Sequence, residues 1–178
     1  MGKPFIIFDR DGTLIEHVPH LIDPDEIRYK PDLVPGLTAL KNAGFHFGMV
    51  TNQSVVGRGL ATLKQVEEIN AIITDYLAVN GIKFEFVLVC PHAPNDDCNC
   101  RKPNIALGIQ AVNDYQLQPK VSYMVGDQES DIFFGKKLGC RVVQVKGNAE
   151  KSASTDYYSE NLLSAANWII NDVPKQGE

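Results

Sequence analysis

Pro4-Phe5-Ile6-Ile7-Phe8-Asp9-Arg10-Asp11-Gly12-Thr13 is the stretch that decides the fold, because an uncharged apolar run ends abruptly in two acidic residues. Such a run is typical of a parallel strand buried on both faces of a sheet. Similar runs recur, and we expect strands at 4–8, 45–50, 84–89, 121–125 and 141–145. Amphipathic segments between them predict helices at 33–43, 62–79, 103–115, 131–138 and 160–170. The alternation predicts an α/β fold, a Rossmann-like three-layer sandwich with a mainly parallel central sheet.

Residues at the predicted helix ends place several boundaries. Thr62 and Gln65 form the pattern of a capping box at the start of the helix 62–79, and Asn80-Gly81 is expected to end it. Gly44 is expected to close the helix 33–43. Pro103 stands where it could open the helix 103–115, and it would hold Lys102 in an extended conformation.

Length and composition bound the kind of protein. The 178 residues are 44% hydrophobic, which suits one compact domain over 1–173 followed by a flexible tail at 174–178. The net charge of -5 argues against a nucleic-acid partner. Charged residues at 9–11 interrupt any signal peptide, and no window is long and apolar enough to span a membrane. We therefore expect a cytoplasmic protein with no membrane partner, and we further expect it to be a monomer.

Polar residues follow the first four predicted strands: Asp9, Thr51-Asn52, Cys90 and Gly126-Asp127. Because the carboxyl ends of parallel strands meet at one edge of a sheet, these residues are expected to converge on one ligand site.

Three carboxylates in this set point to a metal. Asp9 and Asp11 are two residues apart in an extended segment and face the same way, and Asp127 can join them. Carboxylates this close repel one another unless a cation intervenes, and an oxygen-rich site suits Mg²⁺. Asp11-Gly12 alone could be an ordinary turn. A calcium-binding loop is excluded, because Leu14 and His20 stand where its glycine and glutamate belong.

These segments resemble the four motifs of the haloacid dehalogenase-like phosphohydrolases. The matching residues are Asp9-Arg10-Asp11-Gly12-Thr13, Val50-Thr51-Asn52, Lys102-Pro103 and Gly126-Asp127 with Asp131. The resemblance implies that Asp9 is a nucleophile forming an aspartyl-phosphate and that Asp11 is the general acid and then the base. It also implies that Thr51 and Lys102 bind the transferring phosphoryl group. Mg²⁺ would be held by Asp9, the backbone carbonyl of Asp11, and Asp127. Only about forty residues separate Asp9 from Thr51, so we expect a capless fold in which loops 14–32 and 90–100 cover the site.

A second metal site is expected in the loop 90–100. Cys90, His92, Cys98 and Cys100 supply four ligands for a structural, tetrahedral Zn²⁺ that would clamp this loop. The loop resembles the branch of the family that contains heptose bisphosphate phosphatases and histidinol-phosphate phosphatases. The remaining cysteine, Cys140, is expected to be a small core residue.

The substrate is expected to be a small phosphorylated sugar or similar ester. The segment after Thr51, with Arg58, is similar to phosphatases that remove the C7 phosphate of D-glycero-D-manno-heptose 1,7-bisphosphate, an intermediate of nucleotide-heptose and lipopolysaccharide biosynthesis. Histidinol phosphate is the alternative substrate. Candidate substrate-binding residues are Arg10, His17, His20, Asn52, Gln53, Ser54, Arg58, Arg101 and Gln128. The chain departs from the heptose phosphatases at His17-Val18-Pro19-His20, where a glycine-tyrosine pair is usual, and at Gln128, where lysine is usual.

Two other classes use similar residues. A signalling receiver also has a phospho-acceptor aspartate with a threonine and a lysine, but that aspartate follows the third strand, whereas Asp9 follows the first. A zinc-stapled binding module with relic enzymatic residues is the third possibility. The core set is complete in this chain, which favours the enzyme.

Overall fold

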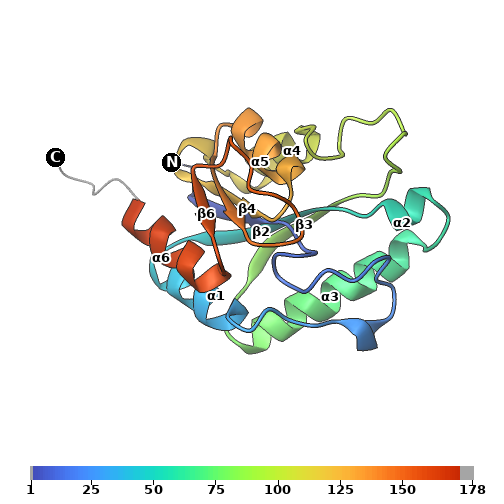
Figure 1. Ribbon diagram of the computed structural model, residues 1–178, viewed down its shortest axis with the longest axis horizontal. Helices are drawn as coiled ribbons and strands as arrows, with labels where there is room; N and C mark the ends of the chain where they lie inside the picture. Colours follow the sequence, from blue (N-terminus) through green and yellow to red (C-terminus); the bar gives the residue numbers. More distant parts are fainter. Residues whose placement is uncertain (1, 173–178) are drawn as a thin grey trace.

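The predicted apolar runs form the strands of one parallel sheet in the computed structural model, which describes residues 2–172 (Figure 1). The predicted tail at 174–178 lies outside the described residues. The strands are β1 (Phe5–Phe8), β2 (His46–Asn52), β3 (Phe84–Cys90), β4 (Tyr123–Gly126), β5 (Arg141–Val145) and β6 (Tyr157–Ser159). They are arranged in the order β3-β2-β1-β4-β5-β6, and every neighbouring pair is parallel.

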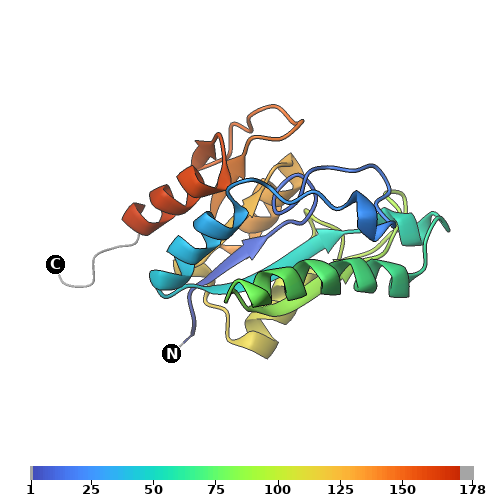
Figure 2. The same cartoon turned by 90° about the horizontal axis from the view of Figure 1, so that it is seen from below.

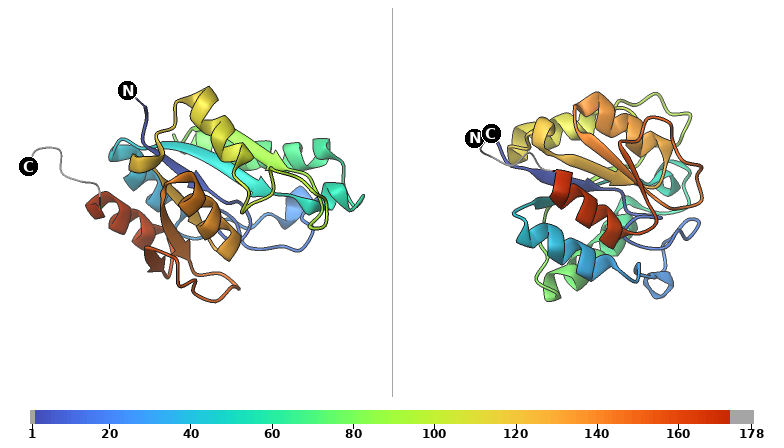
Figure 3. Two further views of the ribbon diagram at one scale, coloured as in Figure 1. Left: turned by 90° about the horizontal axis from the view of Figure 1, so that it is seen from above. Right: turned by 60° about the vertical axis from the view of Figure 1, so that its left-hand side comes forward.

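Helices cover both faces of this sheet and complete the predicted three layers. They are α1 (Leu33–Asn42), α2 (Ser54–Gly57), α3 (Leu63–Val79), α4 (Ala106–Tyr115), α5 (Glu129–Leu138) and α6 (Leu162–Asp172), with short 3-10 helices η1 (Pro24–Glu26) and η2 (Pro119–Val121). The apolar cluster on one face joins the sheet to α1, α3 and α6, and the cluster on the other face joins it to α4 and α5. Figure 2 shows α1, α3 and α6 together on the near side of the sheet, and Figure 3 shows α4 and α5 on the opposite side.

The central strand β1 shows why the apolar run is continuous. Ile6 and Phe8 pack into the cluster with α1, α3 and α6, whereas Phe5 and Ile7 pack into the cluster with α4 and α5. All four side chains are fully buried. Successive side chains of a strand point to opposite faces, so a strand covered on both sides must be apolar at every position.

Most helix boundaries agree with the predictions. The Thr62–Gln65 capping box is present, and α3 ends at Val79 with Asn80 as its C-cap. The prediction that Pro103 opens a helix is wrong, because α4 begins at Ala106. The chain turns first: the Asn104 N–H donates to the Arg101 carbonyl at 2.8 Å, so Pro103 lies inside a turn. Val121 belongs to η2 rather than to a strand, and β4 begins at Tyr123.

The connections between strands leave the carboxyl edge of the sheet open. Between β1 and β2 the chain forms only η1 and α1, and between β3 and α4 it forms only a loop, so residues 2–172 contain no inserted cap domain. No described helix is long and apolar enough to cross a bilayer. Cys140 is buried in the cluster with α4 and α5, which confirms its predicted place in the core.

Candidate active site

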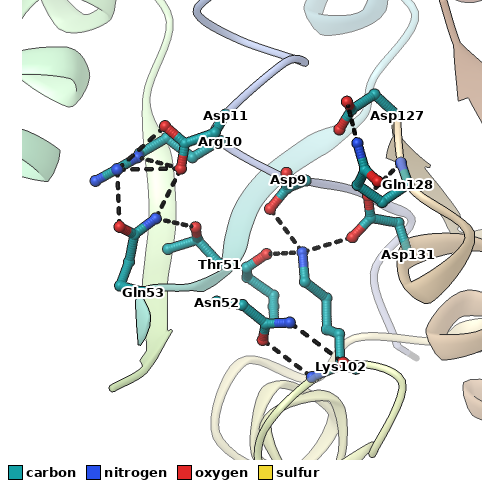
Figure 4. Close-up of polar contacts among 11 residues, drawn as sticks. Asp9, Arg10, Asp11, Thr51, Asn52, Gln53, Lys102, Asp127, Gln128 and Asp131 are labelled. Atoms are coloured by element: carbon teal, nitrogen blue, oxygen red, sulfur yellow. Dashed lines mark hydrogen bonds and ion pairs between the residues drawn. The ribbon is translucent and has the colours of Figure 1, made fainter. Parts of the chain in front are cut away.

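A buried ion pair between Asp9 and Lys102 lies at the centre of the carboxyl edge (Figure 4). Asp9 directly follows β1, and its N–H donates to the Val125 carbonyl at 3.0 Å, which fixes it beside β4. Lys102 Nζ donates to Asp9 Oδ1 at 2.7 Å and to the Val50 carbonyl at 2.6 Å. It also pairs with Asp131 Oδ1 at 2.7 Å. The ammonium is therefore held at the floor of the site.

The charges of this site are unbalanced. Burial raises the pKa of Asp9 to about 7, with Lys102 opposing the rise and Asp131 and Asp11 adding to it. Burial and then the charge of Asp9 raise the pKa of Asp127 to about 6. Burial alone would lower the pKa of Lys102, but Asp131 and Asp9 outweigh it and raise that pKa to about 12. One ammonium thus faces three carboxylates, an arrangement that a further cation would stabilise.

Carboxylate oxygens of Asp9, Asp127 and Asp131 lie within 4.8 Å of one another. Asp127 Oδ1 is buried and has no hydrogen-bond partner among the described residues 2–172. Asp131 has less to offer a metal, because its Oδ1 pairs with Lys102 and its Oδ2 accepts from the Gln128 N–H at 3.0 Å. An unpartnered, buried carboxylate oxygen beside a second carboxylate is what a divalent cation such as Mg²⁺ binds, so the residues present fit the expected ion.

Asp11 belongs to a separate network beside the ion pair. Arg10 Nε and Nη2 donate to the two Asp11 carboxylate oxygens, each at 3.1 Å. Gln53 Nε2 donates both to Asp11 Oδ2 and to Thr51 Oγ1 at 2.8 Å. Gln53 Oε1 in turn accepts from Arg10 Nη2 at 2.9 Å. The network fixes the Asp11 carboxylate and the Thr51 hydroxyl relative to each other (Figure 4).

Two adjoining cavities open on these residues. The first has a volume of about 440 Å³ and is lined by Asp9, Asp11, His17, Asn52, Arg101, Lys102, Gln128, Ser130, Asp131 and Asn148. The second, of about 330 Å³, is lined by Arg10, Asp11, His17, Val18, Pro19, His20, Leu21, Asn52, Gln53, Ser54 and Val55. Asp11, His17 and Asn52 line both. Of the two loops expected to cover the site, 14–32 lines this cleft directly, whereas 90–100 contributes no lining residue.

Two predicted substrate-binding arginines are poorly placed to bind a ligand in these cavities. Arg58 is exposed at the C-cap of α2 and lines neither cavity. Arg10 borders the second cavity, but it is only 1% exposed, and Nε, Nη1 and Nη2 all donate to neighbouring side chains. Its guanidinium therefore has little capacity left for a ligand.

The four predicted zinc ligands come together at the end of β3. The three sulfur–sulfur distances among Cys90, Cys98 and Cys100 are 3.2 to 3.9 Å, and His92 Nδ1 lies 3.2 Å from Cys100 Sγ. Zinc–sulfur bonds of about 2.3 Å in a tetrahedron place sulfurs about 3.8 Å apart. Burial and the neighbouring Cys90 raise the pKa of Cys100 to about 12, so the Cys100 thiol favours its neutral form unless a cation is present. The cluster fits zinc.

The cysteine loop is tied to the cavity walls. The Gln53 N–H donates to the Cys90 carbonyl at 2.8 Å, and the Gly57 N–H donates to the Pro91 carbonyl at 2.7 Å. Arg101 Nη1 donates to the His92 carbonyl at 3.3 Å. Folding of the loop therefore places both the segment after Thr51 and the segment that carries Lys102.

Sequence reasoning assigned no role to several residues in or beside the cleft. Asp131 forms an ion pair with Lys102. Its position four residues after Asp127 was the feature of the sequence that could have indicated a role in the site. Ser130 and Asn148 line the first cavity, but no motif marks them. Asn70, in the middle of α3, accepts from Arg10 Nη1 at 2.9 Å, and its position among apolar residues of a helix gave no indication of this contact.

Comparisons with known proteins identify relatives of the chain. A family model described as HAD-hydrolase-like matches residues 99–174. A Thermoplasma volcanium protein named "Probable D-glycero-D-manno-heptose-1,7-bisphosphate 7-phosphatase" is 37% identical over 134 residues, which are 75% of this chain and 92% of the relative. A histidine biosynthesis bifunctional protein of Blochmanniella floridana is 35% identical over 81% of this chain, but the match spans only 41% of that longer protein.

Solved structures show the same architecture. The structure of D,D-heptose 1,7-bisphosphate phosphatase from B. bronchiseptica, complexed with magnesium and phosphate, superposes with a TM-score of 0.85 at 25% identity. The match covers 96% of this chain and 99% of that protein. The phosphatase of the same name from Burkholderia thailandensis shares the fold, with a TM-score of 0.68 at 20% identity over 96% of this chain and all of that one.

Proposed function

Because the chain belongs to the haloacid dehalogenase-like phosphatases, we propose that it removes the C7 phosphate of D-glycero-D-manno-heptose 1,7-bisphosphate through a phosphoryl-enzyme formed on Asp9. The observation that carries the proposal is the buried Asp9–Lys102 pair beside the unpartnered oxygen of Asp127, at the floor of a cavity that Asp11 also lines. Membership of a phosphatase family argues against the receiver, and the complete set of core residues argues against the relic binding module.

The proposed reaction has two steps with balanced proton transfers. An Asp9 carboxylate oxygen attacks phosphorus while the bond from phosphorus to the sugar oxygen breaks, and the protonated Asp11 gives its proton to that leaving oxygen. Asp11 then takes a proton from water, the resulting hydroxide attacks the phosphoryl group, and phosphate leaves with Asp9 regenerated. Lys102 and Thr51 are proposed to bind the equatorial phosphoryl oxygens.

The proposed magnesium ligands are Asp9, Asp127 and the Asp11 backbone carbonyl. When bound, the ion supplies positive charge that lowers the pKa of Asp9 and offsets the negative charge of the phosphoryl group. The proposed zinc ion, held by the cysteine loop, has a structural role, because four protein ligands leave it no open position.

The residues that line the cleft support a substrate with two anionic groups. The first cavity contains Asp9 and Lys102 for the reacting phosphate, and Arg101 on its wall offers a forked donor for a second phosphate. Gln128 on the same wall is uncharged and donates to Asp127 Oδ2 at 2.7 Å. Arg101 is therefore the proposed specificity residue for a bisphosphate.

Phosphate release from purified enzyme tests the proposal. We expect Mg²⁺-dependent release from the heptose bisphosphate, faster than from histidinol phosphate or a sugar monophosphate. Asp9→Asn should reduce the rate on the order of a thousandfold or more, because the nucleophile is lost. Asp114→Asn, on the exposed face of α4, is the matched control and should retain full activity.

Two results would contradict the proposal. Unchanged activity of the Asp9→Asn variant would reject the phosphoryl-enzyme. Faster hydrolysis of histidinol phosphate by the wild type would assign the chain to histidine biosynthesis, the alternative suggested by the bifunctional relatives.

A further inference from the structure

We infer that Asn70, a buried residue of α3 that lines neither cavity, is a positioning residue for the carboxylate of Asp11 and acts through the guanidinium of Arg10. The inference rests on the proposed function, in which Asp11 protonates the leaving oxygen. It assigns Asn70 a role in the proposed reaction although the residue lies outside every motif of the sequence.

The guanidinium of Arg10 is the link between α3 and the active site. Its Nη1 donates to Asn70 Oδ1 at 2.9 Å, while Nε and Nη2 donate to the Asp11 carboxylate. Nη2 also donates to Gln53 Oε1 at 2.9 Å. Because a guanidinium is planar, fixing Nη1 at one end sets the plane in which Nε and Nη2 meet the carboxylate at the other.

Asn70 is an unusual residue for its place in α3. It is 3% exposed and lies between Ile69 and Ile73, which are members of the apolar cluster. Within residues 2–172 its Nδ2 has no hydrogen-bond partner, and leaving a buried donor unpaired destabilises the fold. The side-chain oxygen of Asn70 therefore accepts a hydrogen bond from Arg10, while its side-chain nitrogen donates none within residues 2–172. A residue whose buried amide serves only this contact fits a positioning role better than a role in packing.

The consequence concerns the step in which the ester bond breaks. Sugar alkoxides are poor leaving groups and need a proton from Asp11, whereas p-nitrophenolate leaves without one. If Asn70 acts by aligning Asp11, its loss must slow cleavage of an alkyl phosphate much more than cleavage of p-nitrophenyl phosphate. A residue that only stabilises the fold would affect both esters equally.

The experiment compares kcat/KM for one sugar phosphate and for p-nitrophenyl phosphate, because kcat/KM reports steps up to phosphoryl-enzyme formation. For Asn70→Ala we expect the ratio of the sugar value to the nitrophenyl value to fall about tenfold. Ile73→Ala, one turn along α3 and fully buried in the cluster, is the matched control. It should lower stability while leaving the ratio within about twofold of wild type. Asn70→Asp retains an oxygen acceptor for Nη1 and should restore most of the ratio.

The outcomes separate this inference from the proposed function. The positioning role would be overturned if the ratio were unchanged in Asn70→Ala, or if it were as low in Asn70→Asp as in Asn70→Ala. Either result would leave the phosphatase assignment in place. Absence of phosphate release from either ester by the wild type would instead reject the proposed function, and the positioning role with it.

Discussion

The side-chain amide of Asn52 binds the backbone of Lys102 on both sides. Asn52 Oδ1 accepts from the Lys102 N–H at 3.0 Å, and Asn52 Nδ2 donates to the Lys102 carbonyl at 3.2 Å (Figure 4). This pair of hydrogen bonds joins the end of β2 to the loop before α4. It places the lysine backbone at a fixed distance from the strand whose Val50 carbonyl accepts from the lysine ammonium.

Asn52→Ala should therefore reduce activity by misplacing Lys102. We expect kcat to fall about tenfold to a hundredfold, since small displacements of catalytic groups carry costs of this order. Asn80→Ala removes a side-chain hydrogen bond to the Tyr76 carbonyl at the end of α3, far from Lys102 in the fold, and is the matched control. Steady-state kinetics of both variants test the effect. Equal kcat in Asn52→Ala and Asn80→Ala would show that the lysine is held by its other contacts.

Gly12 should be needed for tight binding of magnesium. Its φ is +80°, and a Cβ at this position would overlap the Asp127 carboxylate. Gly59 also has a positive φ, +70°, but a Cβ there would meet no atom of residues 2–172 within 4 Å. Alanine at either position should cost about 1–2 kcal/mol of stability through backbone strain. Only Gly12→Ala should raise the Mg²⁺ concentration for half-maximal activity, by tenfold or more as an order of magnitude, because only it displaces a proposed ligand.

Titration of activity with Mg²⁺ and thermal unfolding of the two glycine variants separate strain from displacement. Equal Mg²⁺ requirements in Gly12→Ala and Gly59→Ala would mean that Asp127 moves aside without loss of the ion, and would weaken its assignment as a ligand.

Loss of zinc should disorganise the active site from a distance. Cys100→Ser replaces one proposed ligand, and elemental analysis should show less than half an equivalent of zinc where the wild type retains about one. Activity should fall as well, because the loop carbonyls of Cys90, Pro91 and His92 hold the segments after Thr51 and before Lys102. Cys140→Ser removes a core thiol far from the cluster in sequence and should retain zinc and activity. Full activity in Cys100→Ser without zinc would contradict the clamp.

The sequence predicted the sheet well, because burial on both faces leaves an unambiguous signal. The runs at 4–8 and 141–145 became β1 and β5 almost unchanged. The strand β6 (Tyr157–Ser159) was not predicted, since three residues with two tyrosines carry no periodicity. The start of α4 was misplaced because a proline suits both the first turn of a helix and the turn that precedes it.

The candidate site was predictable where motifs follow strands and unpredictable where side chains meet through the fold. Asp9 and Asp127 could be placed at one edge because each follows a parallel strand, and Lys102 was added to them through the resemblance to the phosphohydrolase motifs. The contact of Asn70 with Arg10 joins residues 60 positions apart, and only the packing of α3 against the sheet determines it. The burial of Arg10 could not be predicted from the sequence either, because an arginine between two aspartates can bind a substrate or hold the fold together.

The acid stability of the fold should depend in part on Asp156. Burial would raise its pKa, but the Lys136 side chain and the Val142 N–H, which donate to its carboxylate at 2.6 and 2.8 Å, outweigh burial and lower the pKa from 3.8. Because the folded state releases this proton at lower pH than the unfolded state, the contribution to stability is complete above pH 3.8. It is lost as the pH falls further, through the lowered pKa of the folded state.

Asp156→Asn removes the charge but keeps an oxygen that can accept from Val142. We expect the variant to be about 0.5–1 kcal/mol less stable than wild type at pH 6, the magnitude of a partly exposed ion pair with one added hydrogen bond. That difference should shrink below pH 3.8, where the wild-type carboxyl also becomes neutral. Urea unfolding at pH 6, 4.5 and 3.5 measures it, with Asp114→Asn as the control because Asp114 makes no ion pair within residues 2–172. A difference that stays constant across these pH values would show that the charge of Asp156 contributes nothing to folding and that its shape alone holds β5.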